Sequence, residues 1–115
     1  MAENSLEMRR ADFEKKVMEE KQTALIEFWA PWCSHCRRIA PLFQQMAEEK
    51  SDKLLFGQIN VDEERDLARQ YGMTVIPTLL LFQGGQVQGS ITAPGSIAQI
   101  EDFIRQFVLK IWEKS

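Results

Sequence analysis

Cysteine and histidine are both scarce in this chain, which has two cysteines and one histidine among its 115 residues. A tetrahedral zinc site takes four ligands, so zinc here would have to recruit carboxylates. The two cysteines, Cys33 and Cys36, lie three positions apart, whereas a disulfide stabilises a fold most when it closes a long loop. This usage argues against a secreted scaffold built on disulfides and favours chemistry at the pair itself. Structural zinc, or an iron–sulfur cluster shared between two chains, stays as a minor alternative, and we predict no metal site.

Long apolar runs and an excess of positive charge are also absent. No stretch approaches the roughly 18–20 consecutive apolar residues that cross a bilayer. The formal net charge of −3 gives no basic field for nucleic acid. Residues 1–10 carry four charged side chains and lack the apolar segment of a secretory signal. We therefore expect no membrane or nucleic-acid partner and a cytoplasmic location, although a mature domain recloned without its leader would look the same.

The length fits one domain over residues 1–115, with residues 1–5 predicted to be a flexible tail. Hydrophobic periodicity predicts helices over 6–20, 33–50, 63–71 and 95–113, and strands over 23–29, 54–61, 78–82 and 86–91. The first two strands should be parallel because a helix connects them, and the last two should form a hairpin at Gly84–Gly85. This order indicates an α/β fold with a mixed sheet between helices. The last helix is expected to turn inward Ile97, Ile100, Ile104, Phe107 and Ile111.

Cys33 and Cys36 are the candidate catalytic residues. Disulfide exchange needs one thiolate to attack and a second thiol within reach to resolve the mixed disulfide. Cys33 opens the predicted helix 33–50, where free backbone N–H groups and the helix dipole favour an anion. Cys36 lies one turn further along and should be less exposed. We predict that Cys33 is the nucleophile and that Cys36 is the resolving thiol.

Three segments resemble the thioredoxin family. The active-site region of that family resembles FWAPWCSHCR at 28–37 and IAP at 39–41, its cis-proline loop resembles VIPT at 75–78, and its hairpin resembles FQGG at 82–85. Order and spacing agree from about residue 13 to residue 108. The resemblance implies the thioredoxin fold, a central mixed β-sheet flanked by helices on both faces. It also implies thiol–disulfide oxidoreductase activity on protein disulfides, with no cofactor besides the Cys33–Cys36 disulfide.

Glu27 is a charged residue in the otherwise apolar strand 23–29, where its burial is costly. It could instead point outward at the strand end. The resemblance places a buried carboxylate here behind the second cysteine, usually Asp in thioredoxins and Glu in protein-disulfide isomerase domains. Desolvation would raise its pKa, and it could then accept the Cys36 proton through a water. Gln58 stands where many thioredoxins have a Lys that pairs with this carboxylate.

Ser34 and His35, between the cysteines, are predicted to tune the reduction potential. The family has Gly-Pro here in typical thioredoxins, Gly-His in isomerases and Pro-His in a strong periplasmic oxidase. An imidazole beside the Cys33 sulfur would stabilise the thiolate and make the disulfide more oxidising. We predict a potential above the value of about −270 mV of ordinary thioredoxin. The alternative is that His35 is an exposed spectator.

Trp32, Ile76 and Pro77 are the predicted substrate-binding residues. By resemblance Pro77 is cis and packs against the disulfide, which leaves the Ile76 backbone to pair with an extended substrate chain. A trans proline that merely opens a strand is the alternative. Trp32 is expected at the surface as part of an apolar patch. Ala93 stands where the family usually has a glycine after the fourth strand.

Two other functions stay open beside a disulfide reductase. One is a dedicated disulfide oxidase or isomerase, which His35 and Glu27 favour. The other is a thioredoxin-fold binding module whose cysteines are incidental. For the catalytic functions we expect protein disulfides or dithiols as substrates, a reductase or oxidant that recycles the pair, and a monomer.

Overall fold

The structure, a computed structural model, describes the backbone of residues 6–113 and the side chains of residues 6–108. The tail predicted over residues 1–5 and the side chain of Ile111 lie outside these ranges. The elements are, in chain order, α1 (Arg10–Phe13), the π-helix η1 (Glu14–Glu19), β1 (Ala24–Trp29), α2 (Ser34–Lys50), β2 (Leu55–Asn60), α3 (Arg65–Gln70), β3 (Thr78–Gln83), β4 (Gln86–Thr92) and α4 (Ile97–Glu113).

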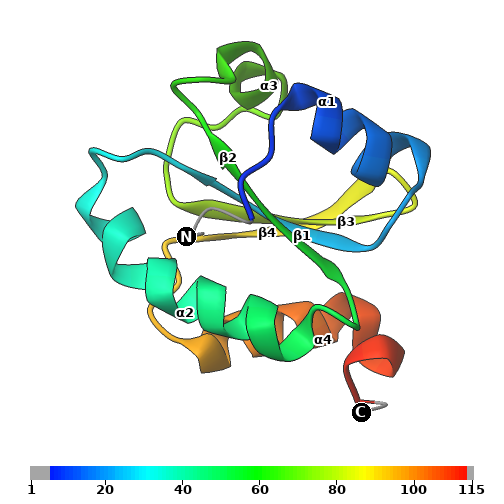
Figure 1. Cartoon of the computed structure of the whole chain (residues 1–115). Helices are drawn as coiled ribbons and strands as arrows, with labels where there is room; N and C mark the ends of the chain where they lie inside the picture. Colours follow the sequence, from blue (N-terminus) through cyan, green and yellow to red (C-terminus); the bar gives the residue numbers. More distant parts are fainter. Residues whose placement is uncertain (1–5, 114–115) are drawn as a thin grey trace.

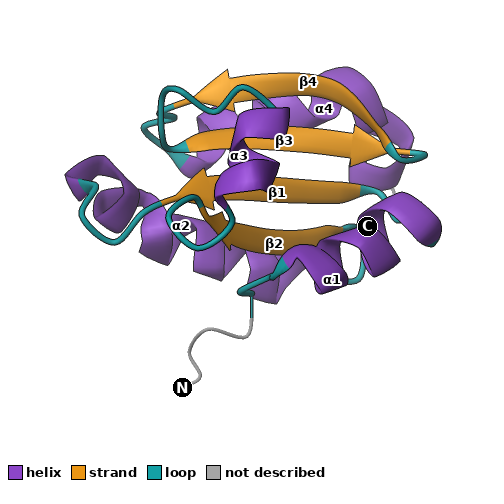
Figure 2. Cartoon of the chain, turned by 90° about the horizontal axis from the view of Figure 1, so that it is seen from above, coloured by secondary structure: helices purple, strands orange, loops and turns teal. Residues whose placement is uncertain are grey.

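The four strands form one mixed sheet in the order β2-β1-β3-β4. β1 pairs in parallel with β2 and antiparallel with β3, and β3 pairs antiparallel with β4. Helices α2 and α4 cover one face of the sheet, and α1 and α3 cover the other (Figures 1 and 2). The predicted thioredoxin fold is therefore confirmed. Among residues 6–113, no helix is both long and apolar enough to cross a membrane.

Two apolar clusters hold the helices to the sheet. On the α2/α4 face, Leu25 of β1 packs with Ile39 and Phe43 of α2. On the opposite face, Ile26 and Phe28 pack in the other cluster. Successive side chains of a strand alternate between faces, so β1 serves both clusters. Each fully buried side chain of this size contributes about 1.5–3 kcal/mol, which fixes α2 against the end of β1 where the cysteines follow.

The prediction of a helix from residue 6 onward is wrong over its first four residues. Met8 donates its N–H to the Gln58 carbonyl, and Gln58 donates its N–H to the Leu6 carbonyl, both at 2.8 Å. This segment therefore extends the sheet beyond β2 and satisfies backbone groups of an edge strand. The side chain of Met8 fills the space over Gly57, where a Cβ would lie only 2.6 Å from its sulfur. Local helical periodicity is overridden by this pairing with a strand fifty residues away.

The last helix differs from the prediction in two respects. It begins at Ile97 instead of residue 95, and Val108 interrupts it with non-helical angles of φ −130° and ψ 45°. Ile100 and Ile104 are fully buried as expected, but Phe107 is 38% exposed. The Phe107 ring lies across Gly89 of β4, where an added Cβ would come within 2.6 Å of it. One side of this ring is therefore packed and the other faces solvent.

Candidate active site

Cys33 and Cys36 form a disulfide at the start of α2, with 5.2 Å between their Cα atoms. Cys33 is the N-cap of α2, with extended backbone angles, and its sulfur accepts the Cys36 N–H at 3.2 Å. The helix therefore begins at Ser34, one residue later than predicted. Cys33 is 8% exposed and Cys36 is 2% exposed, which leaves Cys33 the more accessible sulfur. A free helical N–H aimed at this sulfur favours its thiolate form.

Glu27 is 1% exposed, so the alternative of an outward-facing carboxylate is excluded. It lies opposite Gln58 in the β1–β2 register, and the Gln58 Nε2 donates to its Oε1 at 2.9 Å. Burial raises the pKa of Glu27 from 4.5 to about 7, while the Gln58 hydrogen bond opposes the rise and Glu7 adds to it. A carboxyl group with this pKa exchanges a proton near neutral pH.

A pocket of about 230 Å³ brings Glu27 and Cys36 to the same space. Gln58 lines it from β2 and Arg37 from α2, together with Trp29, Ala40 and Gln44. The volume is ample for water, which needs polar partners of this kind. The pocket therefore offers a route for a proton between the inner cysteine and the buried carboxyl group.

Ile76 and Pro77 lie on the outer side of the disulfide. Their peptide bond is cis, and the Ile76 carbonyl oxygen is 3.9 Å from the Cys33 sulfur. Pro77 is buried and Ile76 half-buried against the cysteine pair. The Pro77 carbonyl accepts the Ala93 N–H at 2.8 Å, which joins this loop to the end of β4. The proline loop thus forms one wall beside the more accessible sulfur.

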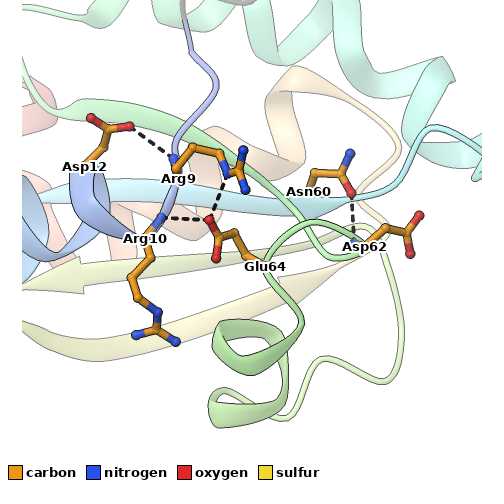
Figure 3. Close-up of polar contacts among 6 residues, drawn as sticks. All are labelled: Arg9, Arg10, Asp12, Asn60, Asp62 and Glu64. Atoms are coloured by element: carbon orange, nitrogen blue, oxygen red, sulfur yellow. Dashed lines mark hydrogen bonds and ion pairs between the residues drawn. The ribbon is translucent and has the colours of Figure 1, made fainter.

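Trp32 is 65% exposed, as predicted, and its Nε1 donates to Asp62 Oδ2 at 2.8 Å. Asp62 follows β2, and its backbone N–H donates to the Asn60 side chain at 2.9 Å (Figure 3). Sequence reasoning missed Asp62. The signal was available, because parallel strands β1 and β2 end at the same edge of the sheet, so residues that follow them meet there.

His35 is half-buried, and its Nε2 lies 3.3 Å from the Pro94 carbonyl oxygen. A carbonyl oxygen only accepts, so Nε2 carries a hydrogen in this contact. The His35 Nε2 is therefore directed to the loop after β4. Ser34 is exposed at the first position of α2. Ala93 adopts a positive φ of 50°, a conformation that favours glycine.

Arg37 closes the turn that precedes the cysteine pair. Its Nη1 donates to the Pro31 carbonyl at 2.8 Å. This contact fixes the chain just before Trp32 and Cys33. Among the side chains of residues 6–108, no group of three or more histidine, cysteine or acidic residues is placed where it could hold a metal ion.

Comparison with known proteins agrees with this geometry. The thioredoxin family model matches residues 4–106. Thioredoxin M4 from Arabidopsis thaliana is 36% identical over 100 residues, covering 87% of this chain and 52% of that protein, so the chain spans about half of its length. The bifunctional thioredoxin reductase/thioredoxin from Mycobacterium leprae is 34% identical over 99 residues, covering 85% of this chain and 22% of that protein.

A solved structure gives the same result. The crystal structure of reduced thioredoxin pre-protein from Schistosoma mansoni is 31% identical, has a TM-score of 0.78, and covers 89% of this chain and 96% of that one. The family match, the common fold and the disulfide at the start of α2 therefore lead to one conclusion. The chain belongs to the thioredoxin family and is a thiol–disulfide oxidoreductase with its redox-active pair at Cys33 and Cys36.

Proposed function

We propose that the chain reduces disulfides in protein substrates, with Cys33 as the attacking sulfur and Cys36 as the resolving one. One observation carries this assignment of roles. The Cys33 sulfur caps α2, receives the Cys36 N–H at 3.2 Å and borders the proline loop, whereas Cys36 is 2% exposed and faces the pocket of Glu27. The outer sulfur can meet a substrate, and the inner one can meet only its neighbour and a proton acceptor.

The exchange takes place in two displacements. In the dithiol form, the Cys33 thiolate attacks one sulfur of the substrate disulfide. The substrate S–S bond breaks, a mixed disulfide forms at Cys33, and the other substrate sulfur leaves as a thiolate. Cys36 then attacks the Cys33 sulfur and releases the second substrate sulfur. Two electrons have passed to the substrate, and the Cys33–Cys36 disulfide seen in the structure has formed.

Glu27 serves the second displacement. Cys36 must lose its proton before or as it attacks, because the thiolate is the nucleophile. The Glu27 carboxylate shares the pocket with Cys36 and accepts that proton through water, and it returns the proton when the disulfide is reduced again. The pKa of Glu27, raised to about 7, suits both directions near neutral pH.

The substrate chain is held by the proline loop and the adjoining apolar surface. Val75 is 55% exposed and precedes Ile76, while Trp32 is 65% exposed beside Cys33. An extended peptide can lie along the Ile76 backbone with its sulfur at Cys33. Main-chain hydrogen bonds and apolar contact are sequence-tolerant, which suits a catalyst acting on many proteins.

The direction of electron flow depends on the potential of the pair. His35 places an imidazole between the two cysteines, next to Cys36 and two residues after Cys33. We propose that it makes this disulfide more oxidising than that of ordinary thioredoxin. Formation of disulfides, the second candidate function, would use the same residues in reverse. We propose a thioredoxin reductase as electron donor, which is supported by the fusion of reductase and thioredoxin in the Mycobacterium leprae relative.

The test is the reduction of insulin disulfides in the presence of excess dithiothreitol. Wild type should accelerate insulin precipitation, and Cys33→Ser should reduce the rate to that of dithiothreitol alone. Circular dichroism of the variant would show that its fold is intact. A Cys33→Ser variant as active as wild type would show that the cysteines are incidental and that the chain is a binding module.

A further inference from the structure

Glu7, Gln58 and Glu27 occupy neighbouring positions on the N-terminal segment, β2 and β1, where Glu7 forms a single bridge to β2. Gln58 is paired in register with Glu27 on one side and bridged to Glu7 on the other. Residues paired in register project from the same face of a sheet. Strands are about 4.8 Å apart, so the two acidic residues are separated by roughly 10 Å of sheet with the Gln58 amide between them.

The Glu7 carboxyl group is partly withdrawn from solvent. Its Oε2 and the Trp29 Nε1 are both buried, and burial raises the pKa of the Glu7 carboxyl group, while hydrogen bonding to the Trp29 indole and to the Asn60 backbone lowers it. Withdrawing a carboxyl group from water costs free energy because its charged form loses hydration. Trp29 also lines the pocket that holds Glu27 and Cys36. Glu7 therefore lies next to the same site, on the segment that pairs with the outer edge of β2.

The segment that carries Glu7 is firmly attached. Its neighbours Leu6 and Met8 hydrogen-bond to Gln58. Just after it, the Glu64 carboxylate accepts from Arg9 Nε at 2.8 Å and from the Arg10 N–H at 3.0 Å (Figure 3). A charge held at a fixed place in a partly buried site acts on its neighbours with little screening.

We propose that Glu7 is a positioning residue of the proton-transfer site, whose negative charge acts on Glu27 across Gln58 and makes Glu27 hold its proton more tightly. This inference rests on the proposed role of Glu27 as proton acceptor for Cys36. It assigns a task to the N-terminal segment that lies outside the cysteine motif and outside the proline loop. In this arrangement, the Gln58 amide stabilises the ionised form of Glu27, whereas the negative charge of Glu7 opposes the ionisation of Glu27.

The charged groups around Glu7, Gln58 and Glu27 agree with this arrangement. Glu7 raises the pKa of Glu27. Burial and the nearby Glu63 raise the pKa of Glu7 itself, while Arg9 and the Trp29 indole N–H oppose that rise. From the other side, α2 contributes Arg37 and the Cys36 sulfur to the pocket. Among these charged groups, Glu7 is the carboxylate that faces Glu27 from the sheet edge.

The experiment follows the Glu27 carboxyl group by carbon-13 NMR in the oxidised protein, where the cysteines carry no proton. Glu7→Gln should lower the Glu27 titration midpoint by about half a pH unit, roughly a threefold change in its acid constant. Glu7→Asp keeps the charge and should stay close to wild type. Glu48→Gln, an equal change of charge on the exposed face of α2, should leave the midpoint unchanged. An unchanged midpoint in Glu7→Gln, or an equal shift in Glu48→Gln, would overturn the inference.

A second measurement distinguishes this inference from the proposed role of Glu27 as proton acceptor for Cys36. The acid limb of the pH profile for insulin reduction should move to lower pH in Glu7→Gln by the same amount as the NMR midpoint, and Glu7→Asp should restore it. Suppose that the NMR midpoint of Glu27 shifts in Glu7→Gln but the pH profile of insulin reduction does not. The two carboxyl groups would then be coupled, but Glu27 would not carry the proton, and the positioning role of Glu7 would be overturned. A loss of all activity with a normal midpoint would contradict it equally.

Discussion

The two sides of the Cys33–Cys36 disulfide differ in almost every physical property. On the outer side, Cys33 is bordered by exposed apolar side chains and by backbone groups of the proline loop, with the Ile76 carbonyl 3.9 Å from its sulfur. On the inner side, Cys36 shares a pocket with Glu27 and Gln58, and Glu27 is 1% exposed. The outer side is suited to contact with another chain, and the inner side is suited to holding a proton.

This difference shows how the four residues 33–36 separate two steps of the reaction, attack on the substrate at Cys33 and loss of a proton at Cys36. Cys33 is the N-cap of α2 and is the more exposed of the two, whereas Cys36 lies within the first turn and is more deeply buried, so each side receives one sulfur. Covalent exchange with a substrate and removal of a proton can therefore be changed separately. Variants of the two sides should fail in different ways, and three predictions test this, beginning with the largest effect.

Cys36→Ser should have the largest effect on turnover. Attack by Cys33 is retained, but the intramolecular resolving step is lost, so the mixed disulfide with substrate accumulates. Because an intramolecular thiol competes at a very high effective concentration, we expect turnover to fall by about 10³-fold or more. Mass spectrometry of the quenched reaction should show one substrate chain attached to Cys33. Cys33→Ser should show no such adduct, and an adduct at Cys36 in that variant would mean that the two sides are equivalent.

Glu27→Gln tests the inner side through the pH dependence of stability. The pKa of Glu27 is raised from 4.5 to about 7 in the folded state, so the folded protein binds this proton more tightly than the unfolded chain. The associated stability is fully present below about pH 4.5 and is lost as the pH rises through about 7, a total of about 3 kcal/mol. Glutamine cannot ionise. Glu27→Gln should therefore match wild type near pH 4 and exceed it by up to about 3 kcal/mol near pH 8.

Urea unfolding at three pH values measures this difference. Glu48→Gln is the control, because Glu48 is exposed on α2. In the same variant, insulin reduction near pH 7 should be slower by about 10²-fold, since a positioned general base is lost. A stability difference independent of pH would mean that Glu27 is not desolvated, and an unchanged rate would mean that it does not accept the proton.

Several features of the site and the core of the fold are predictable from sequence because their signals are local. The strand over 24–29 is a run of apolar residues, the cysteine spacing defines the redox pair, and the Ile76–Pro77 dipeptide defines the loop beside it. Glu27 is conspicuous because it is the one acidic residue within that apolar run. Each of these features depends on a few consecutive residues and survives any error in the placement of more distant segments.

Contacts that depend on pairing between distant residues are less predictable, on both sides of the disulfide. Glu7 belongs to a segment with helical periodicity, and only its pairing with Gln58 brings it to the site. Asp62 reaches Trp32 only because two parallel strands end together. His35 was expected to face the Cys33 sulfur, but its Nε2 is instead directed to Pro94, fifty-nine positions along the chain. Local propensity contains no information about such contacts.

His35 lies between the two sides, and replacing it should give the smallest of the three effects. A positive charge on the His35 ring would stabilise the Cys33 thiolate, which belongs to the reduced form, and this is the basis of the higher potential proposed for the pair. We expect His35→Ala to lower that potential by about 15–30 mV, since about 30 mV corresponds to about 1.4 kcal/mol for a two-electron couple. Equilibration of the pair with glutathione at pH 7 measures the shift.

His35→Gln separates charge from hydrogen bonding. Glutamine can still donate to the Pro94 carbonyl, as His35 Nε2 does at 3.3 Å, but it carries no charge. If charge sets the potential, His35→Gln should lower it as much as His35→Ala does, and added salt should reduce the difference from wild type. If the potential falls only in His35→Ala, the contact with Pro94 acts by holding the loop against the outer side. If the reduction potential changes in neither variant, His35 does not tune the pair, and the N-terminus of α2 alone stabilises the Cys33 thiolate.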